Sequence, residues 1–313
     1  MILMAEAGTT TDEREHPLPG AAEVPMACAC HDPARRRLFT GLLAGAAAPL
    51  LLGQPAEALA ADPECRRSAV TGAVSAETVE GEARRQYVQI MREAQGKNAL
   101  APADDPQLQR LRYIAGRIIP FTPACNPRAR DWRWEVQLLR SNTLNAFCMP
   151  GGKIAFFSGI LSRLKLSDDE VAMIMGHEAA HALLEHARER MVKSTGTNVG
   201  LRLLSALLGL GNLGDLAAQS LSQLASLKFS RDDESEADAL GLLLAARAGY
   251  DPRAGISLWQ KMGAANGGKA PPAWLSTHPA GPERVKEIQQ RLPRALPDYE
   301  RAAAPDRRFP VAT

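Results

Sequence analysis

Two histidines and a glutamate in the middle of the chain form a pattern that can hold and use a metal ion. Residues 177–181 read His-Glu-Ala-Ala-His. In a helix, this spacing places His177 and His181 on one face, where both imidazoles can bind one ion, with Glu178 beside it. Two imidazoles and a later carboxylate suit zinc, which keeps one position open for water in catalytic sites. Glu178 would accept a proton from that water, which is the chemistry of metal-assisted hydrolysis.

The residues around this motif favour a buried helix. Ser167 and Glu170 form a capping box directly before an apolar run, which predicts a helix start there. Ala179 and Ala180 allow that helix to pack closely against its neighbours. Polar groups on a buried helix are costly without a partner such as a metal. A histidine satisfied within the core would explain one imidazole, but not two with a glutamate at this spacing.

The position of a third ligand can be narrowed by elimination. A metzincin-type motif is excluded, because Leu184 and Ala187 stand where that motif needs Gly and His. Residues 190–214 contain no Asp or Glu, so a thermolysin-type glutamate soon after the motif is absent. The first dense acidic cluster lies in residues 232–238.

The order of these two motifs resembles the HtpX and CAAX prenyl protease family of zinc metallopeptidases, with His-Glu-x-x-His followed by Glu-x-x-x-Asp on a second helix. The resemblance implies one zinc ion per chain, with Glu234 as its third ligand. Asp238, one turn later, would hold a ligand imidazole in its tautomer. The alternative is that the acidic cluster is only an exposed helix face. Glu236 is expected to be solvated or ion-paired, and His186 to face solvent or pair with a neighbouring acid.

Residues 145–161 resemble the strand, turn and strand that precede the active-site helix in this family. The Pro-Gly-Gly sequence at 150–152 is a strong turn signal between two β-prone runs. In gluzincins the edge strand nearest the metal holds the substrate backbone by strand addition. The resemblance therefore makes Asn145, Ala146 and Phe147 candidate substrate-binding residues, and the alternative is an ordinary core hairpin.

Residues 276–285 resemble the family's Thr-His-Pro element with a following arginine. His278 would either reach the metal as a masking ligand or steady the tetrahedral intermediate, and Arg284 would support it. Membrane members of the family carry long transmembrane helices, and none is expected in this chain. Residues 199–213 are the best internal candidate but are shorter than the roughly 20 residues that a bilayer requires. A buried helix or a flap over the active site is expected there.

Residues 1–60 have the pattern of a cleaved export signal. Arginines at 35–37 precede an apolar run rich in Gly and Ala, and Ala58-Leu59-Ala60 offers a cleavage site. The arginine pair fits the twin-arginine route, which predicts a periplasmic protein. Ordinary secretion and an uncleaved anchor are the alternatives.

The composition of the remaining residues excludes several classes of protein. The net charge is +2 and aromatic residues make up 5% of the chain, so nucleic-acid binding is not indicated. Three cysteines follow residue 60, and one disulfide is expected in an oxidising compartment. The expected pair is Cys65 with Cys125, because Cys148 lies in the strand beside the active site.

The expected fold is a mainly helical α+β domain of zincin-like type, with a small sheet beside the active-site helix. We expect a helical part at 61–130, a metallopeptidase core at 131–292 and an exposed tail at 293–313. Helices are expected at 76–95, 105–119 and 282–291, and a strand at 132–139.

The expected function is a zinc-dependent endopeptidase of the bacterial envelope that cuts misfolded or unassembled proteins, with peripheral membrane association a further possibility. One alternative is a chaperone-like binding factor with a masked or structural zinc site. Another is a hydrolase of a small amide or a cell-wall peptide. The oligomeric state does not follow from the sequence.

Overall fold

The computed structural model describes residues 63–193, 229–265, 273–278 and 282–312. Its longer elements are the helices α2 (Ala76–Gly96), α3 (Pro106–Ile118), α5 (Asp168–Leu183), α9 (Arg231–Arg247), α10 (Ala254–Ala265) and α12 (Pro282–Arg301). The short helices are η1 (Pro63–Cys65), η2 (Ala69–Ala73), η3 (Ile119–Ala124), η4 (Pro127–Arg130), α4 (Ser158–Arg163), α6 (His186–Lys193) and α11 (Ala273–Thr277). The predicted export signal at 1–60 and the segment at 199–213 lie outside the described residues. Within the described ranges, no helix is long and apolar enough to cross a bilayer.

Three short strands form one sheet in the order β1-β3-β2. The strands are β1 (Glu135–Leu139), β2 (Ala146–Met149) and β3 (Lys153–Phe157). β1 pairs with β3 in parallel, and β2 pairs with β3 in the antiparallel sense. Gly151 and Gly152 have φ values of 86° and 77° in the turn between β2 and β3, a conformation that favours glycine. The predicted strand, turn and strand are therefore confirmed, with β2 at the edge of the described sheet.

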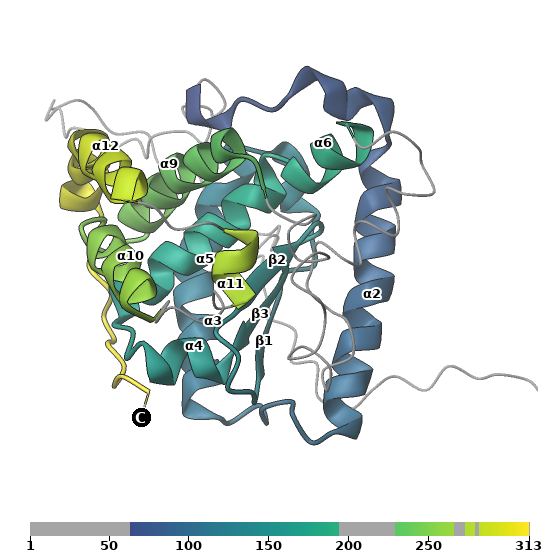
Figure 1. The fold of residues 1–313 in the computed structure, drawn as a ribbon, viewed down its shortest axis with the longest axis horizontal. Helices are drawn as coiled ribbons and strands as arrows, with labels where there is room; N and C mark the ends of the chain where they lie inside the picture. Colours follow the sequence, from purple (N-terminus) through teal and green to yellow (C-terminus); the bar gives the residue numbers. More distant parts are fainter. Residues whose placement is uncertain (1–62, 194–228, 266–272, 279–281, 313) are drawn as a thin grey trace, which may run out of the picture. The chain divides into compact units, whose positions relative to one another are not determined.

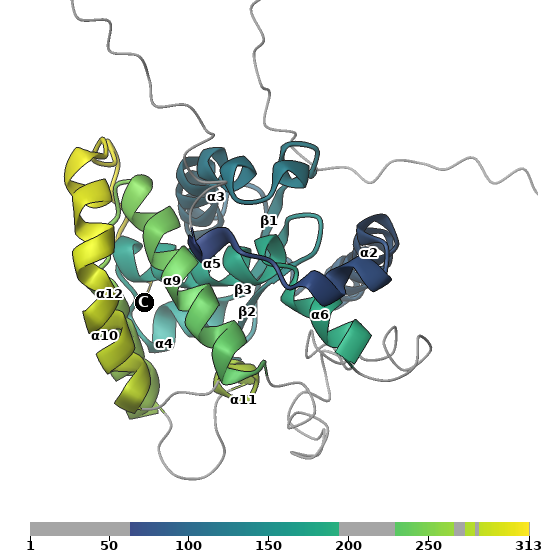
Figure 2. The ribbon, with the colours of Figure 1, turned by 90° about the horizontal axis from the view of Figure 1, so that it is seen from above.

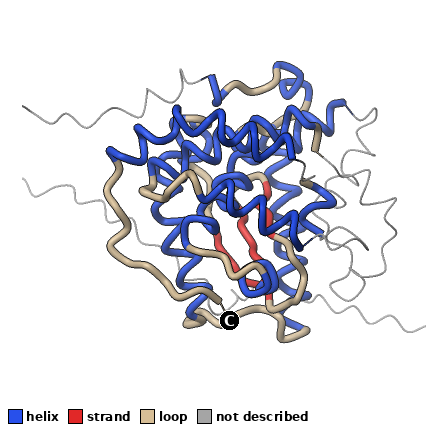
Figure 3. The backbone as a smooth tube through the Cα atoms, turned by 60° about the vertical axis from the view of Figure 1, so that its left-hand side comes forward, coloured by secondary structure: helices blue, strands red, loops and turns tan. Residues whose placement is uncertain are grey.

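The helix α5 lies between the sheet and a second group of helices (Figures 1 and 2). It packs against β2 on one side and against α9 on the other, and α10 also contacts it. Both faces of the sheet are covered. Ala146, Cys148 and Phe156 face the core that contains α5, whereas Phe147 and Met149 join a separate apolar cluster with α2. The tube in Figure 3 shows the strands surrounded by helices, and the predicted mainly helical α+β fold is confirmed.

The C-terminal helix is longer than the sequence indicates. The expected exposed tail from residue 293 is wrong at its start, because α12 continues through Pro293 and Pro297 to Arg301. A proline removes a helical hydrogen bond and strains the preceding turn. Here the buried Ala295 and the ion pair between Arg247 and Asp298 hold the helix together across both prolines.

The residues after α12 return along the domain and are attached to it. The backbone N–H of Phe309 donates to Asp168 at 2.9 Å, and Arg308 pairs with Asp169 at 2.9 Å. Both aspartates lie in the first turn of α5, so the C-terminal segment is tied to the start of the helix that carries the metal motif.

One disulfide fastens the N-terminal part of the described chain. Cys65 at the end of η1 is bonded to Cys125, which directly follows η3. Cys148 on β2 is a buried thiol. The predicted pairing is confirmed.

Candidate metal centre

The helix α5 begins where the sequence predicts and is buried on all sides. The Ser167 side chain accepts a hydrogen bond from the Glu170 N–H, and the Glu170 carboxylate accepts one from the Ser167 N–H at 2.8 Å. Every residue of α5 except Asp169 is buried. The metal motif therefore lies inside the domain, where its polar groups need partners.

Two glycines set the distance between α5 and α9. A Cβ atom built on Gly176 would lie 2.6 Å from the Gly241 carbonyl oxygen, and one on Gly241 would lie 2.7 Å from the His177 nitrogen. Real Cβ atoms do not approach other atoms so closely, so the two backbones touch at these residues. This contact brings Asp238 and Glu234 on α9 next to the histidines of α5.

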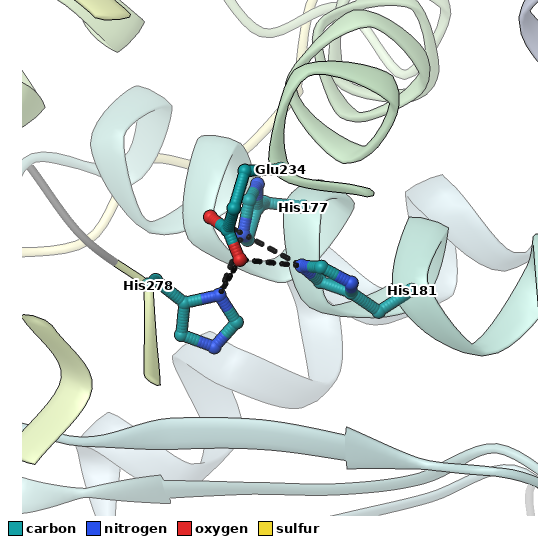
Figure 4. A group of neighbouring side chains, drawn as sticks. All are labelled: His177, His181, Glu234 and His278. Atoms are coloured by element: carbon teal, nitrogen blue, oxygen red, sulfur yellow. Dashed lines mark hydrogen bonds and ion pairs between the residues drawn. The ribbon is translucent and has the colours of Figure 1, made fainter. Parts of the chain in front are cut away.

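Four buried side chains point their donor atoms at one position (Figure 4). They are His177 and His181 from α5, Glu234 from α9, and His278 directly after α11. One donor atom from each lies within 4.8 Å of every other. The structure thus brings together the three expected ligands, with His278 as a fourth donor.

The distances among these donors match a zinc site. The Nε2 atoms of His177 and His181 are 3.1 Å apart, and His177 Nε2 is 3.1 Å from His278 Nδ1. The Glu234 oxygens lie 3.6 Å from His177 Nε2 and 3.5 Å from His181 Nε2. A tetrahedron with bonds of about 2.0–2.1 Å to nitrogen has edges of about 3.3 Å. The donor set therefore fits one tetrahedral zinc ion.

The tautomers of the two α5 histidines also favour a cation. His177 Nδ1 lies 3.0 Å from an Asp238 oxygen, so Nδ1 carries the proton that it donates and Nε2 is left with a lone pair. Burial lowers the pKa of His181 well below its usual value, which keeps this imidazole neutral. Lone pairs of neutral imidazoles repel one another at 3.1 Å unless a positive ion lies between them. Asp238 thus occupies the orienting position that the resemblance implies.

Arg284 supports the carboxylates of the site. Its Nε and NH2 groups each donate to Asp238 at 2.8 Å, and NH1 donates to Glu234. Burial acts to raise the pKa of both acids, but for Glu234 the nearby His278 and Arg284, and for Asp238 mainly Arg284, outweigh it and lower the pKa. The role expected for Arg284 as a support of His278 stays a prediction, because the hydrogen bonds described above go to these two acids and a further contact, at 3.5 Å, goes to His177 Nδ1.

A tryptophan that the sequence analysis did not identify holds the carboxylate of Glu178, the residue expected to accept a proton from the metal-bound water. Trp274 of α11 donates its indole N–H to Glu178 Oε1 at 2.6 Å and is fully buried. Its ring stacks on His278, with the ring centres 5.0 Å apart. A buried indole N–H requires an acceptor, and Trp274 lies one helical turn before His278. That spacing is the only signal in the sequence that could have pointed to it.

His278 bridges the donor set and the general base. Its Nδ1 lies 2.8 Å from Glu234, and its Nε2 lies 3.5 Å from Glu178. Burial acts to lower the pKa of His278, but the negative charges of Glu234 and Glu178 outweigh it and raise the pKa. The imidazole thus stands at the corner of the tetrahedron that water would take in a catalytic zinc site.

His186 and Glu236 also belong to the surroundings of the metal centre. His186 is buried, so the expectation that it faces solvent is wrong, and the alternative that it pairs with an acid is correct. Its Nε2 lies 3.2 Å from Glu236, whose side chain is 53% exposed. Its Nδ1 lies 2.8 Å from Nδ1 of His181.

The candidate substrate-binding residues lie at the start of β2. Asn145 is buried, and its side-chain oxygen accepts a hydrogen bond from the Ala146 N–H. The Phe147 side chain packs with α2 on the sheet face away from α5, so only its backbone could meet a substrate at the strand edge. The Leu144 carbonyl already accepts a hydrogen bond from the backbone N–H of Trp274 at 3.0 Å. Substrate binding by these residues stays a prediction.

A buried helix with two histidines and a glutamate, a second helix with a carboxylate ligand, and a flanking sheet define a zincin-like metallopeptidase. The sequence model of peptidase family M48 matches residues 109–292. The chain therefore belongs to peptidase family M48, whose members are zinc metallopeptidases. The family resemblance seen in the motifs is confirmed, and zinc is the metal that suits the donor set.

Several characterised proteins are similar to this chain. It is 42% identical over 157 residues to the mitochondrial metalloendopeptidase OMA1 of Arabidopsis thaliana, covering 50% of this chain and 31% of that protein. It is 40% identical over 167 residues to the OMA1 protein of Schizosaccharomyces pombe, covering 53% and 48%. The metalloprotease LoiP of Escherichia coli is 28% identical over 208 residues, covering 65% and 78%. The chain thus spans less than half the length of these two OMA1 proteins.

Proposed function

We propose that this protein is a zinc-dependent endopeptidase that cuts misfolded or unassembled proteins in the bacterial cell envelope. The observation that carries the proposal is the position of Glu178. Its carboxylate lies 3.5 Å from Nε2 of His278. The other nitrogen of that ring, Nδ1, is the fourth donor of the metal centre and lies 3.1 Å from Nε2 of His177. A family M48 chain with this arrangement has the groups that peptide hydrolysis requires.

Each residue has a defined task in this mechanism. His177, His181 and Glu234 would hold the zinc, which when bound would supply Lewis acidity toward a peptide carbonyl and a water. Glu178 would accept a proton from the attacking water and return it to the leaving amine. The indole of Trp274 fixes one oxygen of Glu178, so the carboxylate is oriented before substrate arrives.

The location in the envelope rests on separate support. The basic, apolar and small-residue pattern of residues 1–60 is typical of an exported protein. The disulfide between Cys65 and Cys125 is typical of an oxidising compartment. The similar metalloproteases LoiP and YcaL are both from the bacterium Escherichia coli, which supports a bacterial source for this chain but does not bear on its location.

The decisive experiment compares zinc content and cleavage in residues 61–313. Wild-type protein and the Glu178→Gln variant are loaded with zinc and incubated with casein, with and without a chelator. The expected result is cleavage by the wild type only, with equal zinc content, because Glu178 is not a ligand. Glu300→Gln, an exposed substitution on α12, serves as the control and should cleave normally. Strong chelator-sensitive cleavage by Glu178→Gln would refute the proposal.

A chaperone-like binding factor is the second candidate, and one observation favours it. His278 Nδ1 fills the corner that a catalytic site leaves to water. To test it, zinc-loaded wild type and His278→Ala are incubated with unfolded casein. Binding of casein by both proteins, without cleavage by either, would establish this function. A panel of small amides and cell-wall peptides then separates a narrow hydrolase from a binding protein.

A further inference from the structure

Three side chains from three helices form a continuous row behind the metal ligand His181. Nδ1 of His181 on α5 lies 2.8 Å from Nδ1 of His186 on α6. Nε2 of His186 lies 3.2 Å from an oxygen of Glu236 on α9. His186 is 1% exposed, whereas Glu236 reaches solvent. The row therefore leads from the metal centre to the protein surface.

The backbone between α5 and α6 is shaped to form this row. Residues five apart on a straight helix point in different directions, so His186 would not meet His181 if α5 simply continued. Glu185 instead takes a φ of 61°, a left-handed conformation that is uncommon outside glycine. This break turns the chain so that the His186 ring lies 4.9 Å from the His181 ring.

The protons in the row can be assigned from the metal outward. A lone pair on His181 Nε2 is needed for zinc, so the proton of that neutral ring sits on Nδ1 and is donated to His186 Nδ1. His186 must then accept at Nδ1, which places its own proton on Nε2. That proton is donated to the Glu236 carboxylate. Only this arrangement gives every nitrogen in the row a partner.

We propose that His186 and Glu236 are positioning residues that fix the tautomer and orientation of His181 and so increase the protein's affinity for zinc. His177 receives the same support directly from Asp238, whereas His181 receives it from a carboxylate through a second imidazole. Groups that orient a ligand histidine in this way typically contribute about 10- to 100-fold to metal affinity. The inference rests on the zinc site of the proposed function and not on peptidase activity.

Two substitutions of His186 separate hydrogen bonding from packing. The full chain is loaded with zinc, and its zinc dissociation constant is measured by competition with a chromophoric chelator. His186→Leu fills a similar volume but accepts no hydrogen bond, and should weaken zinc binding by about 10- to 100-fold. His186→Asn is smaller but places an oxygen near the position of Nδ1, and should recover most of the affinity. Equal affinities of the two variants, or a weaker His186→Asn, would overturn the proposal.

The exposed end of the row provides a test that does not disturb the core. Glu236→Ala should weaken zinc binding by about two- to fivefold, because the pair it forms is half exposed. In the His186→Asn background the same substitution should have no effect, since the link to Glu236 is already broken. Asp232→Asn removes an exposed charge from the same helix and serves as the control. If Asp232→Asn weakens zinc binding as much as Glu236→Ala does, the loss of affinity is a general effect of charge and the proposal is overturned.

Zinc affinity is read without any substrate, so the outcome is independent of catalysis. A protein that binds zinc with the expected order of variants, yet cuts no peptide, would support the row and refute the endopeptidase. Circular dichroism of each zinc-free variant confirms that the fold is retained before affinities are compared.

Discussion

Replacing Arg284 by methionine should strongly destabilise the zinc-free protein. Methionine keeps much of the length and apolar contact of arginine but carries no charge. The guanidinium is buried, donates to both Glu234 and Asp238, and lies 3.7 Å from the ring centre of Trp259. Its loss would leave the two buried carboxylates without their arginine partner.

The magnitude follows from the burial of all three groups. The side chains of Arg284, Glu234 and Asp238 are only 5–7% exposed, so solvent screens them little. Removing one partner from such a buried group costs about 3–5 kcal/mol of unfolding free energy. In the zinc-loaded protein the cost should be smaller, because the ion also neutralises Glu234.

Urea unfolding with and without zinc measures this cost. The matched control is Arg253→Met, because Arg253 makes the same two-pronged contact with Asp251 on the surface, with its side chain 61% exposed. The control should leave the unfolding midpoint nearly unchanged. Equal midpoints for Arg284→Met and Arg253→Met in zinc-free protein would refute the reasoning.

The pH dependence of the same two proteins gives an independent check. The folded pKa values of Glu234 and Asp238 lie below their ordinary values of 4.5 and 3.8. Their ionised forms therefore contribute stability that is full above those ordinary values and is lost as the pH falls through the lowered values. Without Arg284 the folded pKa values should rise toward or above the ordinary ones, so acidification should cost the zinc-free variant less stability than it costs the wild type, and the difference in stability between the two proteins should narrow as the pH falls.

Three further predictions concern other parts of the domain. His278→Ala should cleave casein faster than the wild type, because it opens the fourth corner of the donor set, and slower cleavage would show that His278 assists catalysis. Cys65→Ser should cost about 4 kcal/mol in urea unfolding, from the loop entropy of a 60-residue separation, and an unchanged midpoint would contradict this. Gly241→Ala should lower stability by about 1–3 kcal/mol and weaken zinc binding, because its Cβ would press on His177. Gly263→Ala, which has open space around it, should not weaken zinc binding, and equal zinc losses in the two variants would refute the contact argument.

Sequence patterns predicted the parts of the site that depend on local spacing. The capping box at Ser167 and the turn at Gly151 and Gly152 depend on neighbouring residues only, and both occur as expected. The two α5 histidines also follow from helical periodicity. Glu234 and Asp238 needed the family resemblance, because nothing in their spacing says which helix they face.

The missed features arise from contacts between distant segments. Trp274 meets Glu178 across 96 residues of sequence. An acid partner for His186 was among the expected alternatives, but the sequence did not identify it as Glu236, which lies 50 residues away. Neither pair has a periodic signal. The extension of α12 beyond Pro293 was missed for a similar reason, since proline disfavours a helix locally and tertiary packing outweighs that preference.

The complete burial of α5 has a consequence for how the protein can move. Amide hydrogens in such a helix exchange with solvent only when the whole domain unfolds, so this segment should be among the slowest to exchange. Trp274 and His278 lie instead on or directly after a five-residue helix, α11, which has far less structure of its own to hold it in place. Trp274 and His278 can therefore rearrange through a local opening of this short helix while the ligands on α5 keep their positions. Access to the metal and its retention would then be governed by separate motions.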